Sequence, residues 1–243
     1  MTDKTKTLDR IYMKFFAEKS IFPPPEKADP DGIVGFSRQI NCRMLADAYY
    51  NGIFPWPFAE DELIPWVCPH RRGVIMMNEF HVPKSLQREM KKFPFSLKIN
   101  HDFNAVITNC ATSSRPEQQG TWITSQLIRV YNEFHRLGYA HSFESYMPDG
   151  TLAGGLYGIS TGRIFCGESM FFKISGASKF AFVKMVEILK SHNVELIDTQ
   201  MVTNATASFG AKEIPSAEYL KLLHVFRGAP LRLADQFPNT LNQ

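Results

Sequence analysis

The hydrophobic pattern changes its period twice between residues 124 and 192, and this constrains the fold more than any other feature of the chain. After Thr124, apolar side chains recur at helical spacing, which predicts a helix that begins at this residue and ends at Gly138. The period then falls toward two, which is typical of strands. Strands are predicted over residues 142–147, 152–160 and 163–172.

A second long amphipathic helix is predicted from Ser175, as its cap, to about His192, with Phe180 falling among its polar residues. A short apolar strand over residues 194–200 follows. Strands followed by a helix and another strand indicate an α+β domain. We expect that domain over residues 74–243. A smaller α/β domain is expected over residues 1–73, with a helical extension in residues 1–21.

The composition is that of a folded, globular protein. In 243 residues, 44% are hydrophobic and 20 are phenylalanine, which favours a sizeable core over disorder. Four scattered cysteines (Cys42, Cys68, Cys110 and Cys166) and histidines without metal-ligand spacing favour reduced thiols and no metal site. There is no signal-peptide pattern and no apolar run of membrane-spanning length, so we expect a cytoplasmic protein without membrane attachment.

Two polar residues end the short strand. Asp198 and Gln200 are two apart, so a regular strand directs both side chains to one face. A carboxylate beside a carboxamide can accept from, donate to and orient a substrate amine. The alternative is a strand end with two solvated polar groups.

Glu168 interrupts an otherwise apolar strand. A buried acid is costly unless it is paired or functional, so Glu168 is either a site carboxylate or an edge residue that reaches water. His141 is either a catalytic base or a structural residue at a strand start. The segment with glycines at 154, 155 and 158 lacks the lysine of a phosphate loop, and the glycines favour close approach of another backbone or of a ligand.

The formal net charge of +3 does not identify a nucleic-acid binder, which needs a local basic patch. One candidate patch is a predicted helix over residues 82–92. Its basic residues are Lys84, Arg88, Lys91 and Lys92. They either face a phosphate backbone or form a solvated face.

A series of short motifs, taken together and in order, resembles one bacterial family, the leucyl/phenylalanyl-tRNA–protein transferases. The resemblance runs from about residue 22 to residue 226. Its segments are residues 52–56 (GIFPW), 120–124 (GTWIT), 135–142 (HRLGYAHS), 154–158 (GGLYG), 167–171 (GESMF), 177–179 (ASK), 197–200 (IDTQ), 208–211 (SFGA) and 214–215 (IP).

The resemblance implies a C-terminal domain similar to the acyl-CoA N-acyltransferase (GNAT) fold. It implies transfer of Leu, Phe or Met from aminoacyl-tRNA to proteins that begin with Arg or Lys, which marks those proteins for degradation. No metal, nucleotide or acyl-CoA cofactor is implied, and we expect a monomer.

The resemblance also assigns roles to residues. Asp198 and Gln200 match residues that orient the acceptor amine, and Glu168 matches a site glutamate. Trp56 and Trp122 match tryptophans that hold the terminal adenosine of the tRNA with its aminoacyl group. An indole ring can hold a base by stacking on it. The implied apolar pocket comprises Leu156, Phe165, Met170, Met185, Leu189 and Ile197.

Two other functions stay open. A CoA-dependent N-acetyltransferase would share the fold, but residues 172–177 lack the pyrophosphate-binding loop expected before the long helix. A non-catalytic tRNA-binding relative is the other, because the chain departs from the family pattern at several positions. The departures are Ser37-Arg38-Gln39, Trp66-Val67, Phe172, Ala205 and Ser216.

Overall fold

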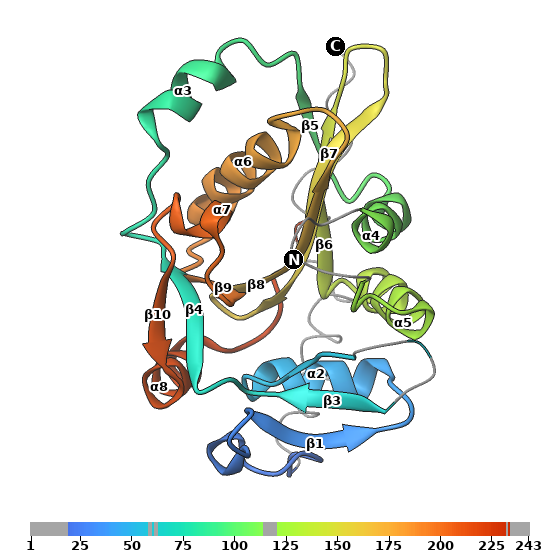
Figure 1. Ribbon diagram of the computed structural model, residues 1–243, viewed down its shortest axis with the longest axis vertical. Coiled ribbons are helices and arrows are strands. Elements are labelled where there is room, and N and C mark those ends of the chain that lie inside the picture. Colours follow the sequence, from blue (N-terminus) through green and yellow to red (C-terminus); the bar gives the residue numbers. More distant parts are fainter. Residues whose placement is uncertain (1–18, 58–59, 61–62, 114–120, 232, 234–243) are drawn as a thin grey trace, which may run out of the picture.

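The computed structural model describes residues 19–57, 60, 63–113, 121–231 and 233, which fold around two β-sheets (Figure 1). The larger sheet has seven strands in the order β10-β4-β9-β8-β7-β6-β5. Its strands are β4 (Arg71–Met76), β5 (Ser96–Ile99), β6 (Ala140–Tyr146), β7 (Leu152–Thr161), β8 (Ile164–Phe172), β9 (Leu196–Gln200) and β10 (Lys212–Pro215). Neighbouring strands are antiparallel except β8 and β9, which are parallel.

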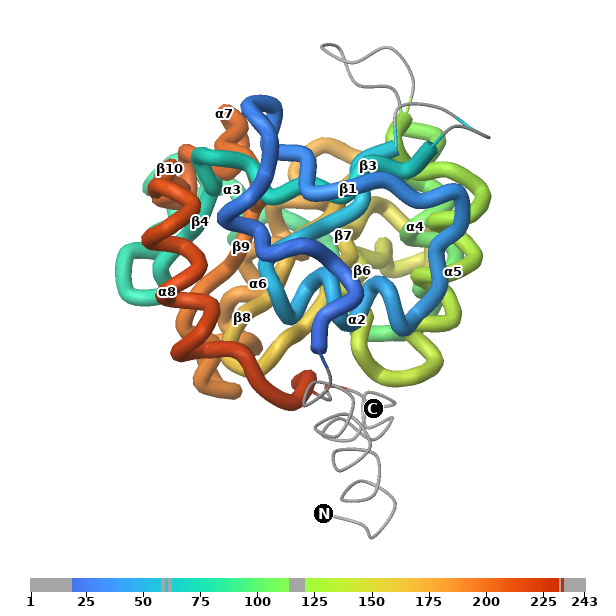
Figure 2. Tube along the Cα trace, turned by 90° about the horizontal axis from the view of Figure 1, so that it is seen from below, coloured from blue at the N-terminus to red at the C-terminus, as the bar shows by residue number. Residues whose placement is uncertain are grey.

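The smaller sheet has three antiparallel strands in the order β1-β3-β2. They are β1 (Ile33–Ser37), β2 (Phe54–Pro55) and β3 (Ile64–Val67). Helix α2 (Cys42–Tyr50) packs beside them, and Figure 2 shows β1 and β3 crossing one end of the molecule. Trp66 of β3 is buried against Phe22, with ring centroids 4.7 Å apart. The chain passes directly from β3 into β4 of the larger sheet.

Helices cover both faces of the larger sheet. Helix α6 packs on one face, whereas α4 and α5 pack on the other (Figure 1). The helices beyond α2 are η1 (Pro25–Lys27), α3 (Lys84–Met90), α4 (Phe103–Thr112), α5 (Ser125–Arg136), α6 (Ala177–Ser191), α7 (Asn204–Ala207) and α8 (Ser216–Phe226). Helix α6 is the crossover that a parallel β8–β9 pair requires. Among the described residues, no helix combines the length and apolarity needed to cross a membrane.

The two faces of the larger sheet bury separate cores. Phe143, Phe165 and Ile197 pack with α6, whereas Tyr157 and Cys166 pack with the core formed by α2, α4 and α5. This alternation along β8 and β7 is what the strand period predicts. The α+β class is therefore confirmed.

The period-based predictions hold for the long elements. Thr124 caps α5 by accepting a hydrogen bond from the Leu127 amide, and Gly138 follows the helix at φ +85°. The glycine interpretation is also confirmed: a Cβ on Gly158 would lie 2.4 Å from the Cys166 carbonyl oxygen. The helical extension expected in residues 1–21 lies mostly outside the described residues.

Two local predictions were wrong. Helix α6 is preceded by Gly176 at φ +86° with no side-chain cap, so Ser175 is not its N-cap. Phe180 is buried although it projects among polar residues, because it packs against Phe95 with ring centroids 5.7 Å apart.

Candidate active site

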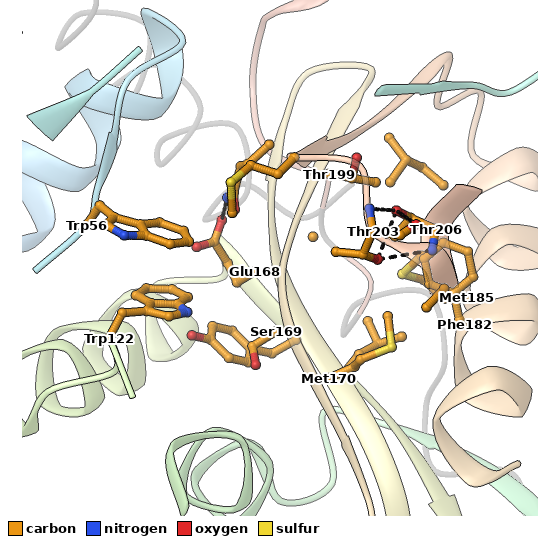
Figure 3. A pocket seen from close by; sticks show the side chains of 17 residues that line it. Trp56, Trp122, Glu168, Ser169, Met170, Phe182, Met185, Thr199, Thr203 and Thr206 are labelled. Atoms are coloured by element: carbon orange, nitrogen blue, oxygen red, sulfur yellow. Dashed lines mark hydrogen bonds between the residues drawn. The ribbon is translucent and has the colours of Figure 1, made fainter. Parts of the chain in front are cut away.

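A cavity opens where two neighbouring strands separate. In the described chain, β8 and β9 pair only through residues 164–166 and 196–198, and both strands continue beyond that point. The cavity measures about 520 Å³ and is lined from both strands past the last pair, as well as from α6 and α7 (Figure 3). The gap between the diverging strands thus provides a concave site without interrupting either core.

Two tryptophans lie at one side of this cavity. Trp56 follows β2 and Trp122 precedes α5, and both line the cavity. Their rings are nearly parallel, with centroids 5.5 Å apart and an interplanar angle of 10° (Figure 3). The fold therefore brings together the two indoles that the sequence motifs singled out.

An apolar wall lies at the other side. Four of the six predicted pocket residues line the cavity, namely Leu156, Met170, Met185 and Ile197. Phe165 and Leu189 do not line it; they are buried in the core behind the wall. Phe182 of α6 does line it and was missed, although it lies one helical turn before Met185.

Glu168 is placed in the cavity by a β-bulge. Tyr157 pairs with Ser169 and Gly158 pairs with Gly167, which leaves Glu168 as the extra residue of β8. The bulge also explains why Phe165 and Met170, five residues apart, both face the α6 side. Sequence alternation alone cannot locate such an insertion.

The Glu168 carboxylate is buried and bonded on both oxygens. Its Oε1 accepts from Gln200 Nε2 at 2.8 Å, and its Oε2 accepts from the Tyr131 hydroxyl at 3.3 Å. The Tyr131 hydroxyl in turn lies 2.6 Å from that of Tyr49. Burial raises the pKa of Glu168 from 4.5 to about 8, and the nearby Asp198 charge also raises it, against hydrogen bonds from the tyrosines. Glu168 is therefore no solvated edge residue.

Gln200 reaches the cavity from an unusual backbone conformation. It has φ +60°, in the left-handed region that residues with a Cβ seldom adopt. Its side chain lines the cavity and bonds to Glu168, and its backbone amide donates to Asp198 Oδ1 at 2.9 Å. Asp198 and Gln200 thus contact each other through the Gln200 backbone amide and not from side chain to side chain.

Asp198, unlike Gln200, does not line the cavity. The residue is fully buried and its oxygens are occupied by neighbours. Arg72 donates to both, from Nε to Oδ1 at 2.8 Å and from Nη2 to Oδ2 at 2.6 Å. The Tyr219 hydroxyl donates to Oδ2 at 2.8 Å, and the Cys166 thiol lies 3.6 Å from the same atom.

Arg72 was missed by sequence reasoning. The available signal was small: an arginine next to a glycine at the start of the apolar run 74–77. Its acidic partner is 126 residues away, so local pattern could not identify the pair.

His141 is a structural residue. Its side chain is buried, with Nε2 donating to the Leu231 carbonyl oxygen at 2.7 Å and Nδ1 accepting from Asn100 Nδ2 at 3.1 Å. Burial lowers its pKa to about 4, against the bond to Leu231, so the ring is neutral at physiological pH. It does not line the cavity.

The predicted basic residues lie on or beside α3, away from the cavity lining. All four of them, Lys84, Arg88, Lys91 and Lys92, are exposed. Whether they bind phosphates stays a prediction.

Comparison with known proteins decides the family. The model of the leucyl/phenylalanyl-tRNA protein transferase family matches residues 74–224, and that of its N-terminal domain matches residues 38–70. The chain belongs to this family.

Several curated relatives carry the same name, leucyl/phenylalanyl-tRNA–protein transferase. The one from Anaeromyxobacter sp. strain K is 46% identical over 202 residues, covering 83% of this chain and 86% of the relative. The one from Pseudoalteromonas atlantica is 41% identical over 232 residues, covering 94% of this chain and 98% of the relative. The one from Klebsiella pneumoniae is 40% identical and covers 89% of this chain and 91% of the relative.

Solved structures resemble the chain only loosely. The structure of L-PGS from Bacillus licheniformis aligns over 70% of this chain and 53% of its own, with a TM-score of 0.38 and 9% identity. A likeness at that level carries no argument about function.

Proposed function

We propose that this family member transfers Leu, Phe or Met from aminoacyl-tRNA to the α-amine of proteins that begin with Arg or Lys, which marks them for degradation. The observation that carries the proposal is the composition of the cavity. A single space joins two stacked indoles, an apolar wall and the Glu168–Gln200 pair. These are the features needed to hold an adenosine, an apolar side chain and an amine.

The C-terminal part is proposed to have a GNAT-like fold, with domains over residues 1–73 and 74–243. The support is a parallel β8–β9 pair joined by α6, whose strands diverge at the cavity. In such a site the aminoacyl ester would enter the gap between the strands.

The reaction is the aminolysis of an ester. The acceptor nitrogen attacks the ester carbonyl carbon, the bond from that carbon to the ribose oxygen breaks, and the leaving oxygen takes up the proton that the amine loses. The products balance without a further reactant. Alignment of amine and ester can supply about 7–11 kcal/mol at best, so positioning is the main contribution of the protein.

Gln200 and Glu168 are proposed to touch the reacting groups. The Gln200 carboxamide oxygen is not bonded to Glu168, which takes the amide nitrogen, so that oxygen can accept from the acceptor amine. Glu168 holds the Gln200 amide and provides the carboxyl group nearest to the amine. Asp198, being buried away from the cavity lining, is proposed to act through the Gln200 backbone.

Trp56 and Trp122 are proposed to grip the terminal adenosine. Stacking of a base on an aromatic side chain contributes about 1–3 kcal/mol. Because the indoles already stack on each other, the adenine would either stack on an outer ring face or separate the pair.

The apolar wall predicts selection by the amino acid carried on the tRNA. Two of the four predicted wall residues are methionines, whose flexible side chains suit Leu, Phe and Met alike. The same tRNA body charged with Asp should be used more than about 100-fold less efficiently than when charged with Leu, because an unpaired carboxylate would be desolvated. Transfer is measured with both charged forms at equal concentration, and equal rates would contradict this specificity.

The basic residues around α3 are proposed to contact tRNA phosphates. Changing Lys84, Arg88 and Lys91 together to Ala should weaken tRNA binding and reduce the slope of log affinity against log salt by about one for each lost contact. Fluorescence anisotropy over a salt series measures the slope. Lys221→Ala on α8 is the control for loss of a charge elsewhere. An unchanged slope in the triple variant would make these residues an ordinary solvated face.

One assay separates the proposed function from its alternatives. The protein is incubated with radiolabelled Leu-tRNA and an acceptor beginning with Arg, and label stable to mild alkali is counted, because a peptide bond survives treatment that hydrolyses the ester. A tRNA-binding relative would retain the tRNA without labelling the acceptor. Modification of the acceptor by labelled acetyl-CoA alone would indicate an acetyltransferase.

A further inference from the structure

Arg72 is a buried cation that does not line the cavity. Its side chain is 1% exposed, and its guanidinium lies between the rings of Phe54 and Tyr219, 4.6 and 4.5 Å from their centroids. Nη1 donates to the Gly52 carbonyl oxygen at 3.2 Å, while Nε and Nη2 bond to Asp198. Hydrogen bonds thus fix the direction of all three guanidinium nitrogens. Few side chains other than the planar guanidinium can make three such directed bonds.

One oxygen atom connects Arg72 to the cavity. Asp198 Oδ1 accepts from Arg72 Nε at 2.8 Å and from the Gln200 backbone amide at 2.9 Å. The two-point bond from Arg72 fixes the rotation of the carboxylate, and the carboxylate then fixes the direction of the Gln200 N–H.

The Gln200 backbone needs such support. A left-handed conformation is strained for a residue with a Cβ, because the Cβ comes too close to the following carbonyl oxygen. Gly73, which pairs with Gln200 across β4 and β9, supports it from the other side. A Cβ on Gly73 would lie 2.5 Å from the Met201 carbonyl carbon, so only glycine lets the chain after Gln200 pass so close. Arg72, through Asp198, and Gly73 thus support the Gln200 backbone from two sides.

We propose that Arg72 is a positioning residue for aminoacyl transfer: through Asp198 it holds Gln200 in the left-handed conformation that directs the carboxamide into the cavity. The inference rests on the proposed role of Gln200 in transfer. Arg72 itself touches neither substrate. A lysine at this position would keep the charge but could not supply the two parallel bonds together with the bond to Gly52.

Arg72→Lys is the first test. At saturating Leu-tRNA and acceptor, its single-turnover transfer rate should fall about 10- to 100-fold, as expected when a reacting group is displaced by a fraction of an ångström to an ångström. Its dissociation constant for Leu-tRNA should stay within about twofold of wild type, because Arg72 does not line the cavity. Arg71→Lys is the matched control: Arg71 is adjacent, exposed and paired with Glu213, and its variant should transfer at the wild-type rate.

A double-mutant cycle with Gln200→Ala distinguishes positioning from a purely structural role. If Arg72 acts through Gln200, Arg72→Lys should cause no further loss of rate once Gln200 is alanine. An equal fold-loss in both backgrounds would overturn the proposal, as would a wild-type rate for Arg72→Lys alone. A wild-type rate for Gln200→Ala would instead sink the proposed role of Gln200, and with it the route through which Arg72 is argued to act.

Tyr219→Phe keeps the test decisive should Arg72→Lys fail to fold. It removes the 2.8 Å bond to Asp198 Oδ2 and the 3.5 Å bond from Arg72 Nη2 to the Tyr219 hydroxyl, but leaves the ring under the guanidinium and both charges in place. A several-fold loss of transfer rate is expected, again only when Gln200 is present. A loss of the same size in the Gln200→Ala background would overturn the proposal.

Discussion

Asp198→Asn should lower the free energy of unfolding by about 3–5 kcal/mol, because it leaves the Arg72 guanidinium buried without a counter-charge. The side chains of this pair are 1% and 0% exposed, so water cannot compensate. For a chain of this length the melting temperature should fall by on the order of 10 °C. Urea denaturation followed by circular dichroism measures the change.

The exposed pair next to it provides the control. Glu213→Gln breaks the ion pair between Glu213 and Arg71, whose side chains are 50% and 59% exposed, respectively. This change should lower the free energy of unfolding by less than about 1 kcal/mol. Combining Asp198→Asn with Arg72→Met should recover part of the loss, since it removes both buried charges. Unchanged stability of the single Asp198 variant would show that the ion pair is not what holds this region together.

Glu168→Gln should abolish a loss of stability that the wild-type protein suffers between pH 5 and pH 8. Burial raises the pKa of Glu168 from 4.5 to about 8, so the folded protein holds this proton more tightly than the unfolded chain does. The stability that the bound proton provides is complete below pH 4.5 and is lost progressively as the pH rises toward 8. The slope within this window reaches at most about 1.4 kcal/mol per pH unit.

The measurement is the free energy of unfolding of both proteins at intervals from pH 5 to pH 9. The difference between Glu168→Gln and wild type should grow in favour of the variant as the pH rises. Glu218→Gln, at an exposed position on α8, removes a carboxylate without touching the Glu168–Tyr131–Tyr49 chain and should leave the wild-type curve in place. Parallel curves for Glu168→Gln and wild type would mean that Glu168 is not desolvated in solution.

Long elements, over which the hydrophobic pattern repeats several times, could be predicted from the sequence. Helix α5 begins directly after its predicted cap, Thr124, and Gly138 follows its end as expected. The short strands β1, β3, β4, β5 and β10 were not predicted. They are four to six residues long, and tertiary pairing defines them more than the local pattern does.

The sequence could predict those site residues that a motif marks individually. It could not predict those whose position depends on a partner far away in the chain. Trp56, Trp122, Glu168 and Gln200 all line the cavity. The places of Phe165 and Phe182 depend on a strand bulge and on how α6 packs against the sheet, which local sequence does not encode. The Arg72–Asp198 pair depends on a contact between β4 and β9 that forms only in the folded chain.

The two stacked indoles come from different parts of the chain. Trp56 lies within the region matched by the N-terminal family model, whereas Trp122 lies within the region matched by the main model. A nucleotide held by both would act as a non-covalent cross-link between these parts. Its binding energy would then favour their association as well as its own retention, by an amount set by its concentration relative to its dissociation constant. Docking of the two parts and capture of the substrate would in that case be linked equilibria, each strengthening the other.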